Sequence, residues 1–112
     1  MEQEIRTESG VTVIAVTGVI DVASSLELRD TLAPALGTAG ARVLLDLSSV
    51  SLIDSSGIGI LIGAHRQAEG TGAMLVLAAP AGPAARVFEL TRTNKLLRIE
   101  PTVEQGLAAL RS

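Results

Sequence analysis

The segment Asp54-Ser55-Ser56-Gly57 gathers the side chains of this sequence best suited to chemistry or recognition. Aspartate and serine are preferred at the start of a helix, because their oxygens accept hydrogen bonds from backbone N–H groups that lack a partner there. One of these residues must cap the helix that follows, whatever the function. Three hydrogen-bonding side chains and a glycine compete for that single position, so we expect the segment to do more than cap.

A phosphoryl group on Ser55 or Ser56 would be tolerated at this position. It would face free N–H groups and the positive end of the helix dipole, an interaction worth about 0.3 to 1 kcal/mol. Asp54 is adjacent, and Asp21 ends another predicted strand that reaches the same sheet edge. The phosphate, with a charge of about -1.5 to -2, would therefore add to a surface that is already negative. No Arg or Lys lies within seven residues of Ser55. The pattern favours a switch that acts on a docked partner by repulsion and bulk, without refolding.

This segment is predicted to join a buried strand to a buried helix. Residues 42–47 are apolar on both faces except at one aspartate, which is typical of a strand covered on both sides in a parallel sheet. Residues 48–54 are predicted to form the connecting loop. Residues 58–65 are apolar nearly all round and predict a largely buried helix. Gly59 and Gly63 each cost that helix about 1 kcal/mol relative to alanine, and we expect close packing to compensate.

Two strands and a helix are predicted ahead of the buried strand. Residues 4–8 and 11–16 read as a hairpin, the second strand being rich in β-branched residues between two glycines. Ser24 and Glu27 have the spacing of a capping box, which predicts a helix that begins at Ser24. Pro34 lies inside this helix and removes one of its hydrogen bonds, so we expect it to kink or shorten the helix.

The chain beyond residue 73 completes the predicted fold. Its patterns predict a strand over 74–77, a helix that starts at Gly82-Pro83 and carries Val87 and Leu90, a strand over 96–99, and a last helix behind a Thr102–Gln105 capping box. Helices that follow strands in the order ββαβαβαβα indicate an α/β fold. We therefore expect residues 1–112 to form a single domain with a mixed, mostly parallel sheet of four to five strands and about four helices.

Composition narrows the classes of partner and cofactor. The sequence has 112 residues, of which 47% are hydrophobic, with Phe88 as its one aromatic residue and a net charge of -3. A surface that binds nucleic acid needs positive charge and usually aromatic stacking, so we expect no nucleic-acid partner. With no cysteine and one histidine, no zinc site is expected, and we predict no cofactor. Residues 1–10 lack the pattern of a signal peptide, and no apolar run approaches about 20 residues, which predicts a cytoplasmic protein without a membrane segment.

Three enzymatic or signalling classes fit the residues less well. His65, the one histidine, lies ten residues beyond Ser55 on the predicted helix, about 14 to 15 Å away, which is too far to activate a serine nucleophile. The glycines of residues 57–63 have GxGxxxG spacing rather than that of a dinucleotide loop, and no P-loop is present. Asp54 as a phosphoacceptor of the receiver type would need an acidic pair and a lysine that the sequence does not place correctly. We expect the chain not to be an enzyme.

The sequence resembles a known family, the STAS-domain anti-sigma factor antagonists, also called anti-anti-sigma factors. The resemblance covers almost the whole chain and rests on two stretches: Leu45-Asp46-Leu47-Ser48-Ser49-Val50 followed by Ile53-Asp54-Ser55-Ser56-Gly57-Ile58-Gly59, and Gly18-Val19-Ile20-Asp21. It implies a STAS-like fold. It also implies that Ser55, the first serine after the aspartate, is phosphorylated by an anti-sigma factor that acts as a serine kinase.

By this resemblance, the unphosphorylated chain sequesters the anti-sigma factor kinase and releases a sigma factor, and a serine phosphatase resets the switch. We expect the surface that binds the partner to comprise Asp21, Ser24, Asp54, Ser56 and Gly57, and the chain to be a monomer or a weak dimer. An alternative within the same family is a non-switching STAS scaffold, or an accessory subunit of a signalling or transport complex.

Overall fold

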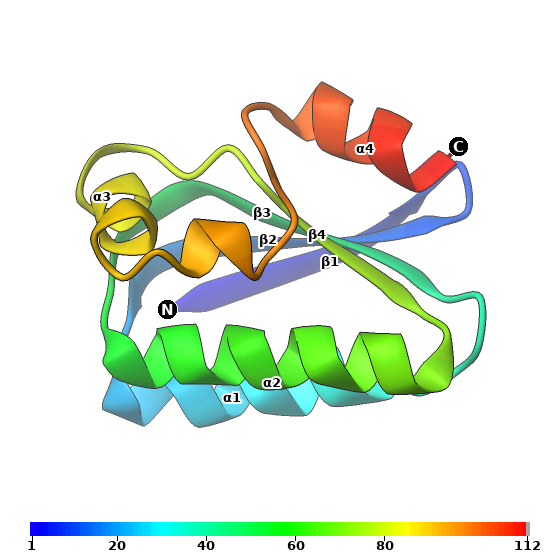
Figure 1. Cartoon of the computed structure of the whole chain (residues 1–112), viewed down its shortest axis with the longest axis horizontal. Helices are drawn as coiled ribbons and strands as arrows, with labels where there is room; N and C mark the ends of the chain where they lie inside the picture. Colours follow the sequence, from blue (N-terminus) through cyan, green and yellow to red (C-terminus); the bar gives the residue numbers. More distant parts are fainter. Residues whose placement is uncertain (112) are drawn as a thin grey trace.

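The computed structural model describes residues 1–111 and is built on one five-stranded sheet (Figure 1). The strands lie in the order β1 (Glu2–Glu8), β2 (Val11–Ile20), β3 (Arg42–Ile53), β4 (Met74–Ala78) and β5 (Ile99–Glu100). β1 runs antiparallel to β2, and every other neighbouring pair is parallel. The prediction of a mixed, mostly parallel sheet is confirmed.

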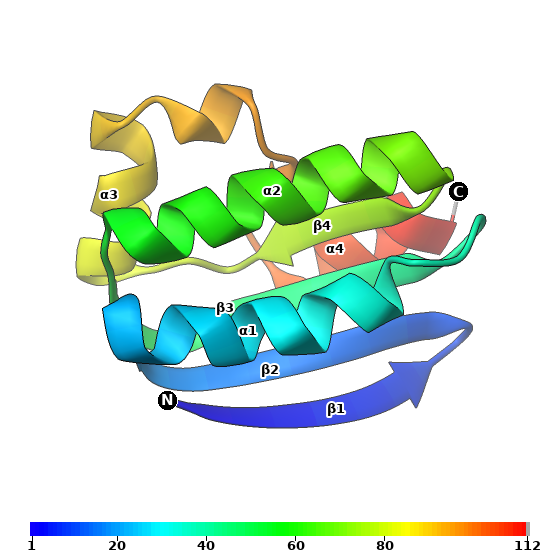
Figure 2. The same cartoon turned by 90° about the horizontal axis from the view of Figure 1, so that it is seen from below.

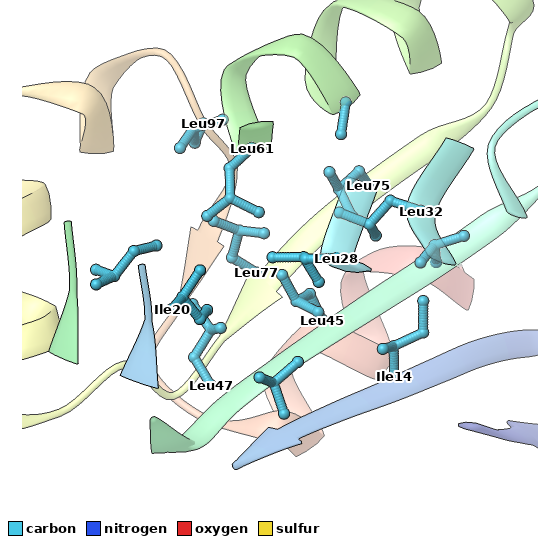
Figure 3. Close-up of a cluster of buried hydrophobic side chains, with 14 of the residues drawn as sticks. Ile14, Ile20, Leu28, Leu32, Leu45, Leu47, Leu61, Leu75, Leu77 and Leu97 are labelled. Carbon is cyan, nitrogen blue, oxygen red and sulfur yellow. The ribbon is translucent and has the colours of Figure 1, made fainter. Parts of the chain in front are cut away.

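Helices cover both faces of this sheet. They are α1 (Val22–Ala35), α2 (Ser55–Thr71), α3 (Gly82–Leu90) and α4 (Val103–Arg111), with a short 3-10 helix η1 (Thr93–Lys95). α1 and α2 lie side by side on one face, and α4 lies on the other (Figures 1 and 2). The larger core fills the space between the sheet and α1 and α2, where leucines from helices and strands meet (Figure 3). A smaller apolar cluster lies beneath α4.

β3 is the central strand of the sheet, as predicted, and it contributes to both cores. Val43 and Leu45 face the larger core, while Leu44 faces the cluster under α4. The strand is longer than predicted: the loop expected over residues 48–54 is wrong, since β3 continues to Ile53 in parallel pairing with β2. The serines of this stretch are exposed, but Val50 and Ile53 between and after them are buried. β2 likewise runs past its predicted end at residue 16 to Ile20.

The start of α1 differs from the prediction. The helix begins at Val22, and its N-cap is Asp21, whose carboxylate accepts the Ser24 N–H at 3.1 Å. The Ser24 hydroxyl accepts the Asp21 N–H at 2.9 Å in return, so the capping box joins Asp21 and Ser24 and not Ser24 and Glu27. Pro34 lies in the last turn, and α1 ends one residue later. A proline so close to the end interrupts little of the helix.

The later elements agree with the prediction in type and differ in detail. In α3, Ala84 and Phe88 are buried and the predicted Val87 packs half-buried against the core, whereas Leu90 is 71% exposed. The strand predicted over 96–99 is the two-residue β5, because the chain first turns through η1. α4 starts behind Thr102 as expected, with the Thr102 hydroxyl accepting the Gln105 N–H at 3.1 Å.

The glycines of α2 have opposite environments. A Cβ on the buried Gly57 would lie 2.6 Å from Ile53 Cγ1 and 2.7 Å from Ile20 Cγ2. Both distances are shorter than the contacts that Cβ atoms make in proteins, so the two isoleucines would have to move. Gly59 and Gly63 are exposed, and a Cβ at either would meet no heavy atom within 4 Å. The predicted close packing of these two residues is therefore wrong. They line an open groove between α1 and α2, so α2 is buried on one side only.

We predict that Gly57→Ala and Gly59→Ala change stability in opposite directions. Gly57→Ala should lower the free energy of unfolding by about 1 to 3 kcal/mol, because the methyl group overlaps two buried isoleucines. Gly59→Ala should raise it by about 0.5 to 1 kcal/mol, since alanine is the better helix former and meets open space. Urea unfolding of both variants measures the difference. A Gly57→Ala variant as stable as the wild type would contradict the packing described for the start of α2.

Candidate functional site

Two helix starts lie next to each other at the carboxyl edge of the sheet. Ile20 and Ile53 are paired at the ends of the parallel strands β2 and β3, and Asp21 and Asp54 follow them directly. The backbone N–H of Asp54 donates to the carbonyl of Ile20 at 3.0 Å, which ties the two strand-to-helix junctions together. α1 and α2 consequently start side by side (Figure 2). Ligand sites of α/β proteins commonly lie at this edge.

Asp54 alone caps α2. Its Oδ1 atom accepts the N–H of Ser56 at 2.9 Å and that of Gly57 at 3.2 Å. The hydroxyl groups of Ser55 and Ser56 take no part in the cap, and neither has a hydrogen-bond partner within the described residues. Ser55 is exposed at the first position of the helix, whereas Ser56 is half-buried. Ser55 is thus the more accessible of the two hydroxyl nucleophiles at a positive helix end.

Asp21 and Ser24 form the neighbouring cap. The backbone N–H of Ser24, and after it the Ser24 hydroxyl, hold the pKa of Asp21 below its ordinary value, so this carboxylate is ionised near neutral pH. Ser24 is 8% exposed, and its hydroxyl also lies 3.0 Å from the carbonyl oxygen of Val19. Ser24 is therefore a buried residue that holds the junction of β2 and α1 through hydrogen bonds, while Asp21 is exposed on the surface.

The site is acidic and lacks an internal cation. Within residues 1–111, neither Asp21 nor Asp54 forms an ion pair. The same part of the chain holds no group of three or more His, Asp or Glu side chains placed to bind a metal ion. His65 lies farther along α2 and approaches Glu69 at 3.5 Å, as part of a half-buried helix face and not of this site. Within the described residues no carboxylate or imidazole is hydrogen-bonded to the Ser55 hydroxyl, so the site presents this hydroxyl without a side chain placed to activate it.

Apolar side chains beside the two caps were not foreseen from the sequence. Val22 and Leu26 in the first turns of α1 are 69% and 51% exposed. Val19 and Leu52, paired across β2 and β3 just before the caps, are 38% and 44% exposed. The spacing of Val22 and Leu26 could have indicated a second apolar stripe on α1, distinct from the buried one. Such exposed apolar residues around a polar centre are typical of a protein-binding surface.

None of the helices described combines the length and the apolar character that a membrane span requires.

Comparison with known proteins identifies the family. The model of the STAS domain matches residues 2–106. The anti-sigma-B factor antagonist of Bacillus subtilis (strain 168) is 31% identical over 94 residues, which cover 84% of this chain and 85% of that protein. The chain therefore belongs to the STAS domain family, among the anti-sigma factor antagonists. These relatives are regulators that bind another protein, and the prediction that the chain is not an enzyme is confirmed.

Solved structures agree with this family and fold. An anti-sigma factor antagonist from Mycobacterium paratuberculosis superimposes with a TM-score of 0.82 at 28% identity, covering 99% of this chain and 94% of that one. The anti-sigma-factor antagonist (STAS) domain protein from Planctomyces limnophilus gives a TM-score of 0.82 at 21% identity and covers 98% of each chain, which shows the shared fold. The predicted STAS-like α/β fold is confirmed.

We predict that Asp21 makes stability depend on pH in the acid range. Because its pKa is lower in the folded state, its contribution is full above the ordinary aspartate pKa of about 4 and is lost as the pH falls through the lower folded value. Asp21→Asn should therefore be less stable than the wild type at pH 6, and the difference should shrink towards pH 2. Unfolding at several pH values measures it, with Asp30→Asn on the exposed side of α1 as control. A difference that stays constant down to pH 2 would contradict this role.

Proposed function

We propose that the unphosphorylated chain sequesters an anti-sigma factor that is also a serine kinase, and that phosphorylation of Ser55 ends this binding. While the chain holds the anti-sigma factor, the sigma factor is released. Once phosphorylation ends the binding, the anti-sigma factor is again available to the sigma factor, until a serine phosphatase restores the binding form of the chain. The proposal places the chain in the cytoplasm, where transcription is regulated. Membership among the anti-sigma factor antagonists supports the class of partner.

The observation that carries the assignment to Ser55 is the cap of α2. Because Asp54 satisfies the free N–H groups of Ser56 and Gly57, the Ser55 hydroxyl is not needed to start the helix. It is exposed, while the neighbouring Ser56 is half-buried. A kinase that docks on the start of α2 therefore meets the hydroxyl of Ser55 before that of Ser56.

The chain acts in this proposal as a substrate. The kinase supplies ATP, the Ser55 hydroxyl oxygen attacks the γ-phosphorus, ADP leaves, and the serine proton passes to a base of the kinase. No base of this chain activates Ser55 in the structure, since within the described residues neither a carboxylate nor His65 is hydrogen-bonded to its hydroxyl. The phosphatase uses water to return the hydroxyl and inorganic phosphate.

The phosphate would change the surface and leave the fold in place. At the start of α2 it lies at the positive end of the helix dipole, where negative charge is tolerated. It adds about -1.5 to -2 charges beside Asp21 and Asp54, and no cation within the described residues balances these carboxylates. The exposed apolar side chains of Val22 and Leu26 would then border a strongly charged group. A partner that buries this surface would lose affinity through repulsion and desolvation.

We predict that Ser55→Ala abolishes phosphorylation and keeps the chain bound to its kinase in the presence of ATP. The wild type, Ser55→Ala and Ser56→Ala are each incubated with the cognate anti-sigma factor and ATP, and the modified residue is located by mass spectrometry. Ser56→Ala is the matched control and should be phosphorylated like the wild type. Phosphate found on Ser56 or Asp54 alone would contradict the assignment, and binding without phosphorylation of any variant would favour a non-switching scaffold.

A further inference from the structure

A small cavity lies between α2 and η1, on the opposite side of α2 from α1 (Figure 2). Its volume is about 240 Å³, and its lining includes Ile62, His65, Arg66 and Glu69 from α2 and Lys95 and Leu97 from the segment that begins with η1. It shares no lining residue with the groove between α1 and α2. Pockets for drug-sized ligands have volumes of roughly 300 to 1,000 Å³, so an occupant of this cavity is small.

Two basic side chains from different elements line this cavity. Arg66 comes from α2, and Lys95, the one lysine of the chain, comes from η1. Within residues 1–111 neither of them forms an ion pair. Among the described residues that line the cavity Glu69 is the one carboxylate, and it already lies 3.5 Å from Nε2 of His65. The cavity therefore carries more positive than negative charge, in a chain whose net charge is -3.

The backbone around η1 fixes the position of Lys95. Arg92 has a positive φ of 57°, which is uncommon for a residue other than glycine, and it turns the chain from α3 into η1. The N–H of Leu97 donates to the carbonyl of the buried Thr93 at 2.9 Å. Leu97 then enters the larger core near Leu61 of α2 (Figure 3). Because buried residues hold this wall of the cavity, binding a ligand does not require the chain to become ordered first.

Apolar side chains complete the lining. Leu97 is 5% exposed, and Ile62 is half-buried and packs against the larger core. An inorganic anion would leave this apolar surface in contact with water, whereas an aliphatic group would cover it. The lining therefore suits a ligand that combines a negative charge with a short hydrocarbon part.

We propose that this cavity binds a small organic anion, in which a carboxylate or phosphate group is joined to a short aliphatic chain. The anionic group lies between Arg66 and Lys95, where it attracts both cations and accepts hydrogen bonds from them. The aliphatic chain contacts Ile62 and Leu97. The volume of the cavity excludes a bulky ligand, and the two basic side chains exclude a cationic one.

Titration of the whole chain, followed by backbone amide NMR, tests this proposal with four probes. Butyl phosphate and pentanoate should each shift the amide signals of residues 62–69 and 93–97 until the site is saturated, and the tighter of the two identifies the anionic group. Butanol, which has no charge, should not bind. Inorganic phosphate should bind more weakly than butyl phosphate, because it leaves Ile62 and Leu97 uncovered.

Charge reversal at the two cations locates the site. Arg66→Glu and Lys95→Glu should each weaken the binding of butyl phosphate by about tenfold or more, since repulsion replaces a hydrogen-bonded pair of opposite charges. Arg86→Glu is the matched control and should bind like the wild type, because it changes the net charge equally at an exposed residue of α3 outside the cavity. Glu69→Gln should bind more tightly, since it removes a carboxylate from the lining.

Three results would overturn the proposal: no saturable shift with either acid at millimolar concentration, equal shifts with butanol, or equal weakening by Arg86→Glu and Lys95→Glu. Circular dichroism checks that every variant is folded. The titration uses this chain alone, without an anti-sigma factor or ATP, so its outcome is independent of the function proposed for Ser55.

Discussion

The contact of Gly57 with Ile20 and Ile53 is the constraint on which the candidate functional edge of this protein depends. The first turn of α2 rests directly on the paired ends of β2 and β3, at a distance that leaves no room for a Cβ atom. The hydrogen bond from the Asp54 N–H to the Ile20 carbonyl holds the same junction through the backbone. Together they fix where α2 begins, and therefore where Ser55 is presented.

The four adjacent residues at the start of α2 differ in what they contribute to the structure. Asp54 caps the helix and Gly57 permits the packing, so Ser55 is left exposed and free of hydrogen bonds within the described chain. A capped, rigid helix end can accept a phosphate without a change of fold, because the dipole favours negative charge there. Under the proposed function, a phosphate on Ser55 would be read as a change of surface, which suits a chain that belongs among the anti-sigma factor antagonists.

Local patterns predicted the order of the elements and the helix start behind Asp54, because burial on both faces of residues 42–47 and the residues of a helix start are visible in the sequence. What they could not predict depends on neighbours. The extension of β3 to Ile53 is a ladder with β2 that exposed serines conceal. Asp21 and Ser24 have the same spacing as Ser24 and Glu27, so the sequence did not distinguish the two capping boxes. Gly59 is exposed because a groove separates α1 from α2, and the spacing of two helices is not visible in the sequence.

The central claim is that phosphorylation of Ser55 alters the surface and not the fold. Comparing the backbone amide NMR spectra of the unphosphorylated and fully phosphorylated protein tests this most directly. The account predicts shifts confined to the two helix starts, around residues 20–26 and 52–59, with the remaining amide signals unchanged. Shifts spread through β4, α3 and α4 would show that the phosphate reorganises the core, and would contradict a switch that acts by charge and bulk.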